Sequence, residues 1–413
     1  MVKLQEVQSF KTKSRIDDIE ILRGIAASMV LISHFHLVLV RWPLPAWQNF
    51  TAHYADFWTG VDLFFAISGF VIARSLLPGL ARAQPAGLAG SYLASFWVRR
   101  AWRLWPTAWL WLFVMLVQAQ WFNRADAVAG DGHLNAMALL AGIAMVANFR
   151  HALVDIQSAM YGISGHYWSL SFEEQFYFLL PLVVLACRRR LTTVLTVACA
   201  LSFLLPVHLS FPFFPHPLLW GIESPFFFYF RPQALLAGVL LAMIEQRGWL
   251  TTRLPAQLRQ NSTVRRCLFA LGMLGLIAAA PIGRPVGFYL IDIIALSAML
   301  LVGLAAQNRD DLPLRGGARR PLLWLGSRSY AIYVIHMPVF FATREIWSRL
   351  MPGQNWAGLG WAAIFAATAV LALGPLAELN YRYVEMPLRR YGARLADAIS
   401  WSGSKTQMRA SET

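Results

Sequence analysis

The sequence has 413 residues, of which 57% are hydrophobic and 14% are charged, and its mean hydropathy is +0.49. This composition is too apolar for a soluble globular domain and indicates an integral membrane protein. The net charge of +15 comes from Lys and Arg in short segments between apolar runs, which is the pattern of cytoplasmic loops, so nucleic acid is not an expected partner. The three cysteines lack CxxC spacing, so neither a disulfide framework nor a zinc site is indicated.

Ten segments are long enough to cross a bilayer, by the criterion of about 20 largely apolar residues. They lie near residues 19–42, 57–80, 105–122, 172–187, 191–207, 227–245, 267–281, 286–306, 322–345 and 359–382. The positive-inside rule places the basic cluster Arg188-Arg189-Arg190 in the cytoplasm. The chain then crosses the membrane an even number of times between Arg103 and Arg188, so the further apolar stretch at 134–150 is not expected to cross. We therefore predict an all-α polytopic membrane protein with about ten transmembrane helices, a non-crossing helix near 134–150 and both termini in the cytoplasm.

These spans divide the chain into three parts. They are a cytoplasmic N-terminal segment (1–18), a membrane domain (19–390) and a cytoplasmic tail (391–413). The tail is polar and is expected to be disordered.

Two polar residues share one face of the first predicted span. Arg23 and His34 are eleven positions apart, which is three helical turns and roughly 16 Å along the axis. Each costs roughly a few kcal/mol in hydrocarbon, so both should face a polar cavity inside the bundle. This face is therefore a candidate functional path.

Depth in the membrane brings two more residues to the level of His34. Counted from the inner ends of their spans, His34 and His336 lie roughly 22 Å and 21 Å deep, and Asp62 lies near the outer end of its own span. A histidine takes and returns protons near neutral pH, and a carboxylate on its other nitrogen fixes its tautomer. We interpret this His/Asp/His layer as a general base for a hydroxyl. One alternative is that these residues only form structural hydrogen bonds between helices. Metal ligation is the weakest of the three interpretations, because the sequence has no HxxxH spacing.

A basic cluster precedes the third predicted span. Arg99, Arg100 and Arg103 stand just before Pro106, which is expected to mark the start of the helix. Such guanidinium groups can bind phosphates bidentately, although ordinary positive-inside anchoring explains them as well. Because Arg23 lies on the line toward His34, a donor with a phosphorylated head and a long arm could reach the histidine.

The polar and aromatic segment from Gly165 to Tyr177 enters the fourth span from outside. It suits binding of sugar hydroxyls beside a carboxylate. The alternative is an interfacial belt whose Ser and Glu only cap the helix. The candidates here are His166, Trp168, Ser169, Ser171 and Glu173.

Together these segments resemble the integral membrane acyltransferase 3 family, whose ten-span bacterial enzymes O-acylate surface glycans. The matching segments run in order along most of the chain. They are Leu22 to Phe35, Gly60 to Phe70, Arg99 to Pro106, the WSLSxE-like stretch from His166 to Glu173, Arg231 to Gly238, Leu325 to Pro338, and Tyr381 to Pro387.

The resemblance implies acetyl-CoA or another acyl-CoA as a cytoplasmic donor substrate, with no permanently bound cofactor. It implies His34 as the catalytic base, and it associates Arg100, Arg103 and Arg23 with the donor; Arg99 of the same cluster is a further candidate. Asp62, Glu173 and His336 complete the predicted catalytic set.

The first hypothesis is an O-acyltransferase of the bacterial inner membrane, acting on a glycan hydroxyl near Glu173 and Trp168. Ser68, Tyr330 or a protonated His336 could donate hydrogen bonds to the thioester oxygen as negative charge develops there. The acceptor stays open among lipopolysaccharide, exopolysaccharide, lipid-linked glycan precursors and small hydrophobic molecules. A proton-coupled transporter or flippase and an accessory subunit of a glycan assembly complex are the alternatives.

Overall fold

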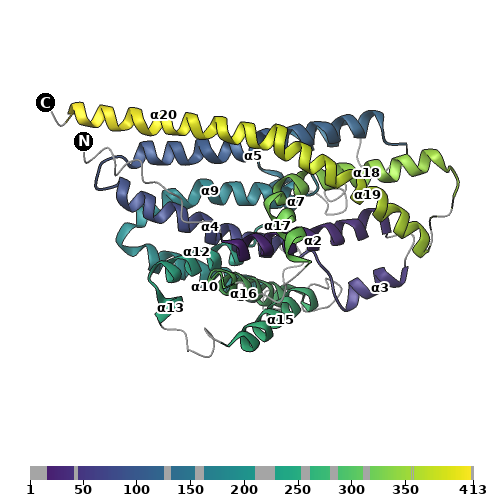
Figure 1. Ribbon diagram of the computed structural model, residues 1–413, viewed down its shortest axis with the longest axis horizontal. Coiled ribbons are helices and arrows are strands. Elements are labelled where there is room, and N and C mark those ends of the chain that lie inside the picture. The colour runs from purple at the N-terminus through teal and green to yellow at the C-terminus, as the bar shows by residue number, and fades with distance from the viewer. Residues whose placement is uncertain are drawn as a thin grey trace.

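The computed structural model describes residues 16–40, 45–124, 132–153, 162–209, 228–252, 261–279, 287–309, 317–354, 356 and 358–410. Every regular element within these ranges is a helix, which confirms the predicted all-α class. The longer helices run roughly along one axis and form an elongated bundle (Figure 1). The predicted N-terminal segment 1–18 lies almost entirely outside the described residues.

The first half of the chain contributes the helices that carry most of the candidate residues. In chain order they are α2 (Asp17–Phe35), the π-helical η1 (His36–Val40), α3 (Pro45–His53), α4 (Gly60–Ala83), α5 (Ala89–Trp121), α6 (Gly132–Ile143), α7 (Ala147–Leu153), α9 (Tyr167–Cys187), η2 (Arg188–Arg190) and α10 (Leu191–Leu209). Acidic Asp17, Asp18 and Glu20 occupy the first turn of α2, where negative charge complements the helix dipole.

The second half closes the bundle around them. Its helices are α12 (Gln233–Gln246), α13 (Trp249–Thr252), α15 (Ser262–Ala278), α16 (Gly287–Ala305), α17 (Arg319–Ser327), α18 (Ser329–Leu350), α19 (Leu359–Asn380), the π-helical η3 (Tyr381–Glu385) and α20 (Met386–Ala410). The start of α15 is capped by Asn261, whose side chain accepts hydrogen bonds from the backbone N–H groups of Thr263 at 2.9 Å and Val264 at 3.2 Å.

Within the part of the chain that the structure describes, three helices are apolar and long enough to cross a membrane, by length and composition: Asp17–Leu39, Gly60–Ala83 and the continuous Leu359–Ser400. Shorter apolar helices cover Gly132–Ile143, Gln233–Gln246 and Leu290–Ala305. The predicted number of ten spans and the cytoplasmic placement of the termini stay predictions.

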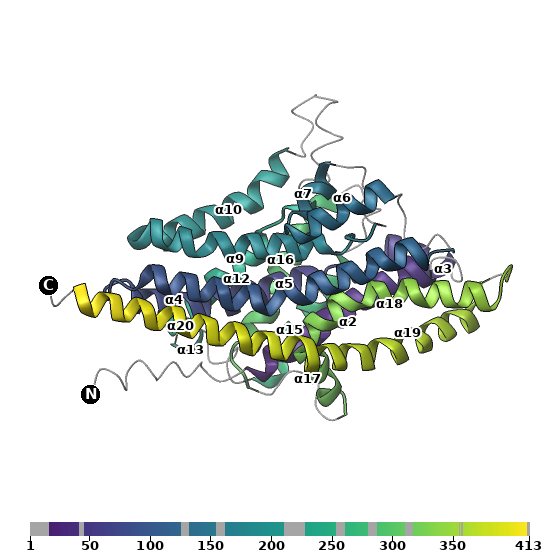
Figure 2. The ribbon, with the colours of Figure 1, turned by 90° about the horizontal axis from the view of Figure 1, so that it is seen from above.

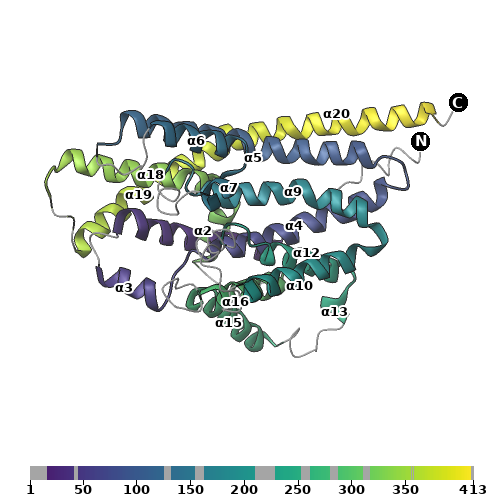
Figure 3. The same ribbon diagram turned by 180° about the vertical axis from the view of Figure 1, so that it is seen from behind.

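The ambiguous stretch at 134–150 forms two short helices. A turn at Met145, which has a φ of 54°, separates α6 from α7. At 1.5 Å per residue α6 is roughly 18 Å long, which is too short for a hydrocarbon core of about 30 Å. In Figure 3 these helices lie beside α5 and α9, which they also contact. Their length fits a helix that enters the membrane without crossing it.

The basic cluster lies on a helix rather than in a loop. Helix α5 begins at Ala89, well before the expected start near residue 105, and Pro106 lies inside it. An interior proline costs about 3 kcal/mol. Packing of α5 along α20 and α18 offsets this cost, so the helix continues through Arg99, Arg100 and Arg103.

The tail that was expected to be disordered continues as α20 to Ala410. It runs beside α5 in both Figure 1 and Figure 2. The rings of Trp102 on α5 and Tyr391 on α20 meet with centroids 4.7 Å apart, and a Cβ on Gly392 would lie 2.2 Å from Cβ of Trp102. This aromatic face gives the polar helix a surface to bury, which composition alone did not indicate.

A helix break shapes the region beside Arg23. The single span expected at 322–345 is two helices, α17 and α18, which meet at Arg328. Helix α17 packs closely on α2: a Cβ on Gly24 would lie 2.3 Å from the Leu322 carbonyl oxygen, and one on Gly326 would lie 1.9 Å from that of Glu20. This contact fixes the start of α2, and with it Arg23.

Helices α4 and α12 are in backbone contact, which generates a stability prediction. A Cβ on Gly238 would lie 2.2 Å from the Ala66 carbonyl oxygen. Gly238→Ala should therefore force the helices apart and lower stability by about 1–3 kcal/mol, measured as a lower unfolding midpoint of the detergent-solubilised protein. Gly374→Ala in α19, where no atom lies within 4 Å, is the control. Equal midpoints for the two variants would contradict the close approach.

Candidate active site

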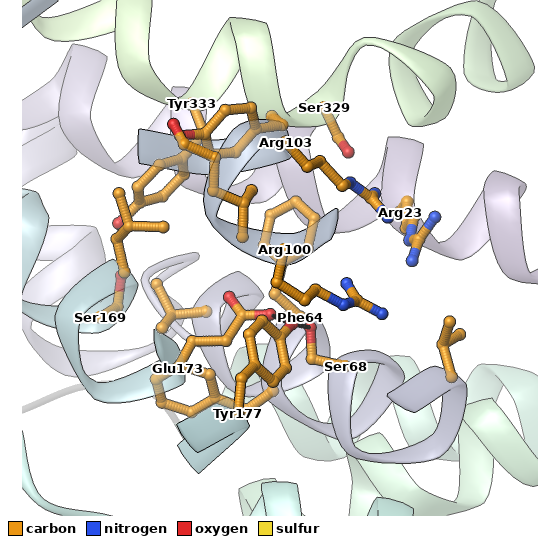
Figure 4. A pocket seen from close by; sticks show the side chains of 16 residues that line it. Arg23, Phe64, Ser68, Arg100, Arg103, Ser169, Glu173, Tyr177, Ser329 and Tyr333 are labelled. Carbon is orange, nitrogen blue, oxygen red and sulfur yellow. Dashed lines mark hydrogen bonds between the residues drawn. The ribbon is translucent and has the colours of Figure 1, made fainter. Parts of the chain in front are cut away.

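The described residues enclose a cavity between α2, α4, α5, α9 and the start of α18, with about 770 Å³ of empty space including its mouth. Figure 4 shows its lining, in which polar and charged side chains from all five helices converge. The polar members are Arg23, Ser68, Arg100, Arg103, Ser169, Glu173, Tyr177, Ser329, Tyr330 and Tyr333. Several residues predicted separately from the sequence therefore line one cavity.

Positive charge gathers on one side of the cavity. The guanidinium groups of Arg23, Arg100 and Arg103 point to the same side, away from Ser169 and Tyr333 (Figure 4). Arg23 is paired with Glu20 at 2.9 Å, whereas Arg100 and Arg103 have no salt bridge to any described residue. Guanidinium groups that make no direct salt bridge can bind an anion such as a phosphate.

Arg99 stands apart from this group. Its Nη2 lies 3.1 Å from Oγ of Ser95, and its Nη1 lies 3.6 Å from Oδ1 of Asp397 on α20. It does not line the cavity. The structure thus separates Arg99 from the neighbours with which the sequence grouped it, because its side chain turns toward α20.

A hydrogen-bonded group of three residues forms the wall between α4 and α9. The hydroxyls of Ser68 and Tyr177 both donate to Oε1 of Glu173, and they lie 2.9 Å from each other. The guanidinium carbon of Arg100 sits 5.0 Å from the centre of the Tyr177 ring. The predicted carboxylate Glu173 is therefore held at the cavity surface beside a cationic group.

Ser169 and Tyr333 line the end of the cavity opposite the arginines (Figure 4). The Tyr333 hydroxyl donates to the backbone carbonyl of His166 at 2.7 Å, so the Ser169 hydroxyl, 2.5 Å away, donates to Tyr333. Tyr330 also lines the cavity, and its hydroxyl donates to the backbone carbonyl of Leu104. These bonds fix α18 against α9 and α5.

Two other predicted substrate contacts are buried outside the cavity. The Ser171 hydroxyl accepts the backbone N–H of Ala147 at 3.2 Å and so holds the start of α7. The Trp168 ring packs on the guanidinium group of Arg231, 4.8 Å from its centre. Neither side chain lines the cavity.

Three histidines meet beyond Tyr333. Nδ1 of His34 lies 2.8 Å from Nε2 of His336, and Nδ1 of His336 lies 2.6 Å from the backbone carbonyl oxygen of Tyr333. The His166 ring lies 5.3 Å from that of His336, centre to centre. Among the described residues, no group of three His, Cys, Asp or Glu side chains is placed to hold a metal ion.

His336 borders a second, smaller hollow of about 150 Å³ between α2 and α18. His336 and Tyr333 line it together with Ala27, Val30, Leu31 and Ile332. Tyr333 lines both hollows, whereas the half-buried His34 lines neither and reaches the smaller one only through its contact with His336. The Tyr333 side chain is therefore the common wall between the arginine-rich cavity and the histidines.

The predicted His/Asp/His layer required a hydrogen bond between Asp62 and a histidine, and the structure shows none among the residues it describes. Its two carboxylate oxygens accept from Nε and Nη2 of Arg231, at 2.8 Å and 3.0 Å. Both side chains are buried, and the guanidinium group also lies 4.7 Å from the Trp58 ring centre and 4.5 Å from that of Phe228. A buried ionised carboxylate costs several kcal/mol unless a close cationic partner compensates it, which explains why Asp62 pairs with Arg231.

Sequence reasoning assigned no role to Arg231, Tyr177 or Tyr333. A signal for Arg231 exists, because an arginine inside an apolar aromatic segment needs polar partners at its own depth, and a carboxylate is one of them. The tyrosines carry no comparable signal, since aromatic residues are common throughout this chain.

Comparisons with known proteins define the class of the chain. The family model described as an acyltransferase domain matches residues 16–376, so this chain belongs to the acyltransferase 3 family. It is 25% identical over 352 residues to the peptidoglycan O-acetyltransferase OatA of Listeria monocytogenes, covering 81% of this chain and 51% of that protein. It is 26% identical over 363 residues to the O-acetyltransferase OatA of Staphylococcus aureus, covering 81% and 53%.

The chain thus spans about half the length of the curated relatives it matches. No solved structure matches it.

The buried ion pair between Asp62 and Arg231 generates a prediction about stability. Asp62→Asn leaves the Arg231 guanidinium buried without a counter-charge, so stability should fall by about 3–5 kcal/mol. The double variant Asp62→Leu with Arg231→Met should recover much of that loss, since it removes both charges together. Unfolding midpoints of the purified proteins measure both effects. A double variant no more stable than Asp62→Asn would argue against the pairing.

Proposed function

We propose that this chain is an O-acetyltransferase of the bacterial inner membrane that moves an acetyl group from cytoplasmic acetyl-CoA to a hydroxyl of a cell-envelope glycan. The observation that carries the proposal is the cavity with arginines on one side and Tyr333, the wall to the histidines, on the other. The names of the relatives make peptidoglycan the first acceptor to test. Lipopolysaccharide, exopolysaccharide and lipid-linked glycan precursors are the next acceptors to test.

The arginines suit the head of the donor. Coenzyme A carries phosphate groups, and Arg100 and Arg103 offer guanidinium groups without salt bridges to described residues. Charge-assisted hydrogen bonds of this type are roughly twice as strong as neutral ones. We place the phosphates beside Arg23, Arg100 and Arg103, with the arm extending toward Ser169.

The walls of the cavity suit the arm of the donor. Oε2 of Glu173 has no hydrogen-bond partner among the described residues, since both hydroxyls of the group bind Oε1. It is available to accept an amide N–H of the arm, while Phe64, Phe65 and Leu104 cover the apolar stretches. The acyl end then meets Tyr333, whose ring has to turn aside before the thioester reaches the histidines.

At the histidines the proposed reaction is general-base catalysis. His34 takes the proton of the glycan hydroxyl as its oxygen attacks the thioester carbonyl carbon. The carbon–sulfur bond then breaks, and the leaving thiolate takes the proton back from the imidazolium. The products are the acetyl ester and coenzyme A, and the imidazole returns to its neutral form.

The arginine side of the cavity predicts which charges bind the donor. Arg100→Ala and Arg103→Ala should each raise KM for acetyl-CoA about 10- to 100-fold, since each removes charge-assisted hydrogen bonds of about 1.5–3 kcal/mol. Arg99→Ala is the matched control, because it removes a charge from the same helix but outside the cavity. Steady-state release of coenzyme A measures all three. The same KM for Arg99→Ala and Arg100→Ala would remove the cavity from the donor site.

The base assignment predicts a split between binding and chemistry. His34→Ala should lower kcat for acetyl transfer by about 100-fold or more, because general-base catalysis contributes roughly 10²–10⁴-fold. Binding of coenzyme A, measured by calorimetry, should stay unchanged, because His34 does not line the cavity. Transfer at the unmutated rate would end the base assignment. A protein that binds no coenzyme A would instead favour the transporter hypothesis.

A further inference from the structure

The two nitrogens of His336 have different partners, and this fixes where its proton sits. Nδ1 of His336 lies 2.6 Å from the carbonyl oxygen of Tyr333. A carbonyl oxygen only accepts hydrogen bonds, so this nitrogen carries the proton. In a neutral imidazole the other nitrogen, Nε2, is then an acceptor.

That assignment determines the proton on His34. Nε2 of His336 accepts, and its neighbour at 2.8 Å is Nδ1 of His34, so Nδ1 of His34 must be the donor. The chain of protons runs from His34 through His336 to the carbonyl of Tyr333. In the neutral pair, Nε2 of His34 is left with a free lone pair.

We infer that His336 is a positioning residue, which holds His34 in the tautomer that presents Nε2 as the basic nitrogen. This inference deepens the proposed function and names the atom at which the proton of the acceptor is taken. His336 neither gains nor loses a proton in the step. It accepts the Nδ1–H bond of His34 before, during and after the transfer.

The surroundings explain why the acceptor of the His34 Nδ1–H bond is the imidazole of His336 and not a carboxylate, as in other sites with a histidine base. His336 is fully buried, so a carboxylate at this position would add a second buried charge. Asp62, the carboxylate that the sequence proposed for this role, is bound on both oxygens by Arg231. A neutral acceptor still stabilises the imidazolium, since a hydrogen bond from a charged donor is stronger than a neutral one.

The same helix orients the positioning residue. The acceptor for Nδ1 of His336 is the carbonyl three residues earlier in α18, so the ring orientation is set by its own helix. T-shaped contacts with the rings of Phe340 at 5.7 Å and His166 at 5.3 Å, centre to centre, also pack against the His336 ring. No hydrogen bond joins His166 to His336, so His166 stays outside the proton chain.

A spectroscopic measurement tests the tautomer without any assay of activity. In the full-length protein labelled with [15N]histidine in bilayers, solid-state 15N NMR distinguishes protonated from bare ring nitrogens. The His34 signals are those that disappear in His34→Asn. We expect a protonated Nδ1 and a bare Nε2, and partial loss of this tautomer in His336→Leu. A proton on Nε2 in the unmutated protein would overturn the inference.

A matched pair of amide variants tests the positioning role in catalysis. The amide of Gln reaches about as far as Nε2 of histidine, and that of Asn only as far as Nδ1. His336→Gln should therefore keep kcat within about 10-fold, whereas His336→Asn and His336→Leu should lower it about 100-fold with KM for acetyl-CoA unchanged. Equal kcat values for the Gln and Asn variants would contradict the role. Unmutated protein that shows the expected tautomer but transfers no acetyl group would instead end the proposed function alone.

Discussion

The hydrogen bond between His34 and His336 joins the first described helix to α18 across most of the chain. It depends on the general constraint that a polar group inside an apolar bundle needs a partner, since an unpaired one costs several kcal/mol in hydrocarbon. His34 meets this requirement through Nδ1, which leaves Nε2 for the proposed base chemistry. The histidine pair thus stabilises the fold and, in the proposed mechanism, sets the basic nitrogen.

Charged groups in the bundle meet the same constraint in two ways. Asp62 and Arg231 form a closed pair inside an aromatic cage, with no charge left for a ligand. Arg100 and Arg103 border a cavity instead, where water can solvate them and an anionic ligand can neutralise them. This contrast separates charges in closed ion pairs from charges that border a cavity better than position in the sequence does, because both kinds lie in aromatic-rich, apolar surroundings.

Hydrophobic runs in the sequence predicted the helical class and placed most long helices. Ordered polar motifs selected Arg23, Arg100 and Arg103 for the donor, and Ser169, Glu173 and Tyr330 for the substrate and the chemistry, as separate groups. The structure shows that all six line one cavity. The sequence patterns did not predict the contacts between distant segments. The pairing of Asp62 depends on a residue 169 positions away, and the order of α20 depends on an aromatic face buried against α5. The local pattern around Pro106 also misplaced the start of α5. Helix propensity disfavours an interior proline, but it does not include the tertiary packing that offsets this cost.

The central claim is that a donor held by arginines delivers its acyl group past Tyr333 to the histidine pair. A cryo-electron microscopy structure with a non-hydrolysable acetyl-CoA analogue tests it most directly. The account predicts phosphates against Arg100 and Arg103, a displaced Tyr333 ring, and the acyl carbon within about 5 Å of Nε2 of His34. That distance leaves room between them for an acceptor oxygen at a reacting separation of about 3–3.5 Å from the carbon. An analogue bound elsewhere, with His34 facing lipid, would contradict it.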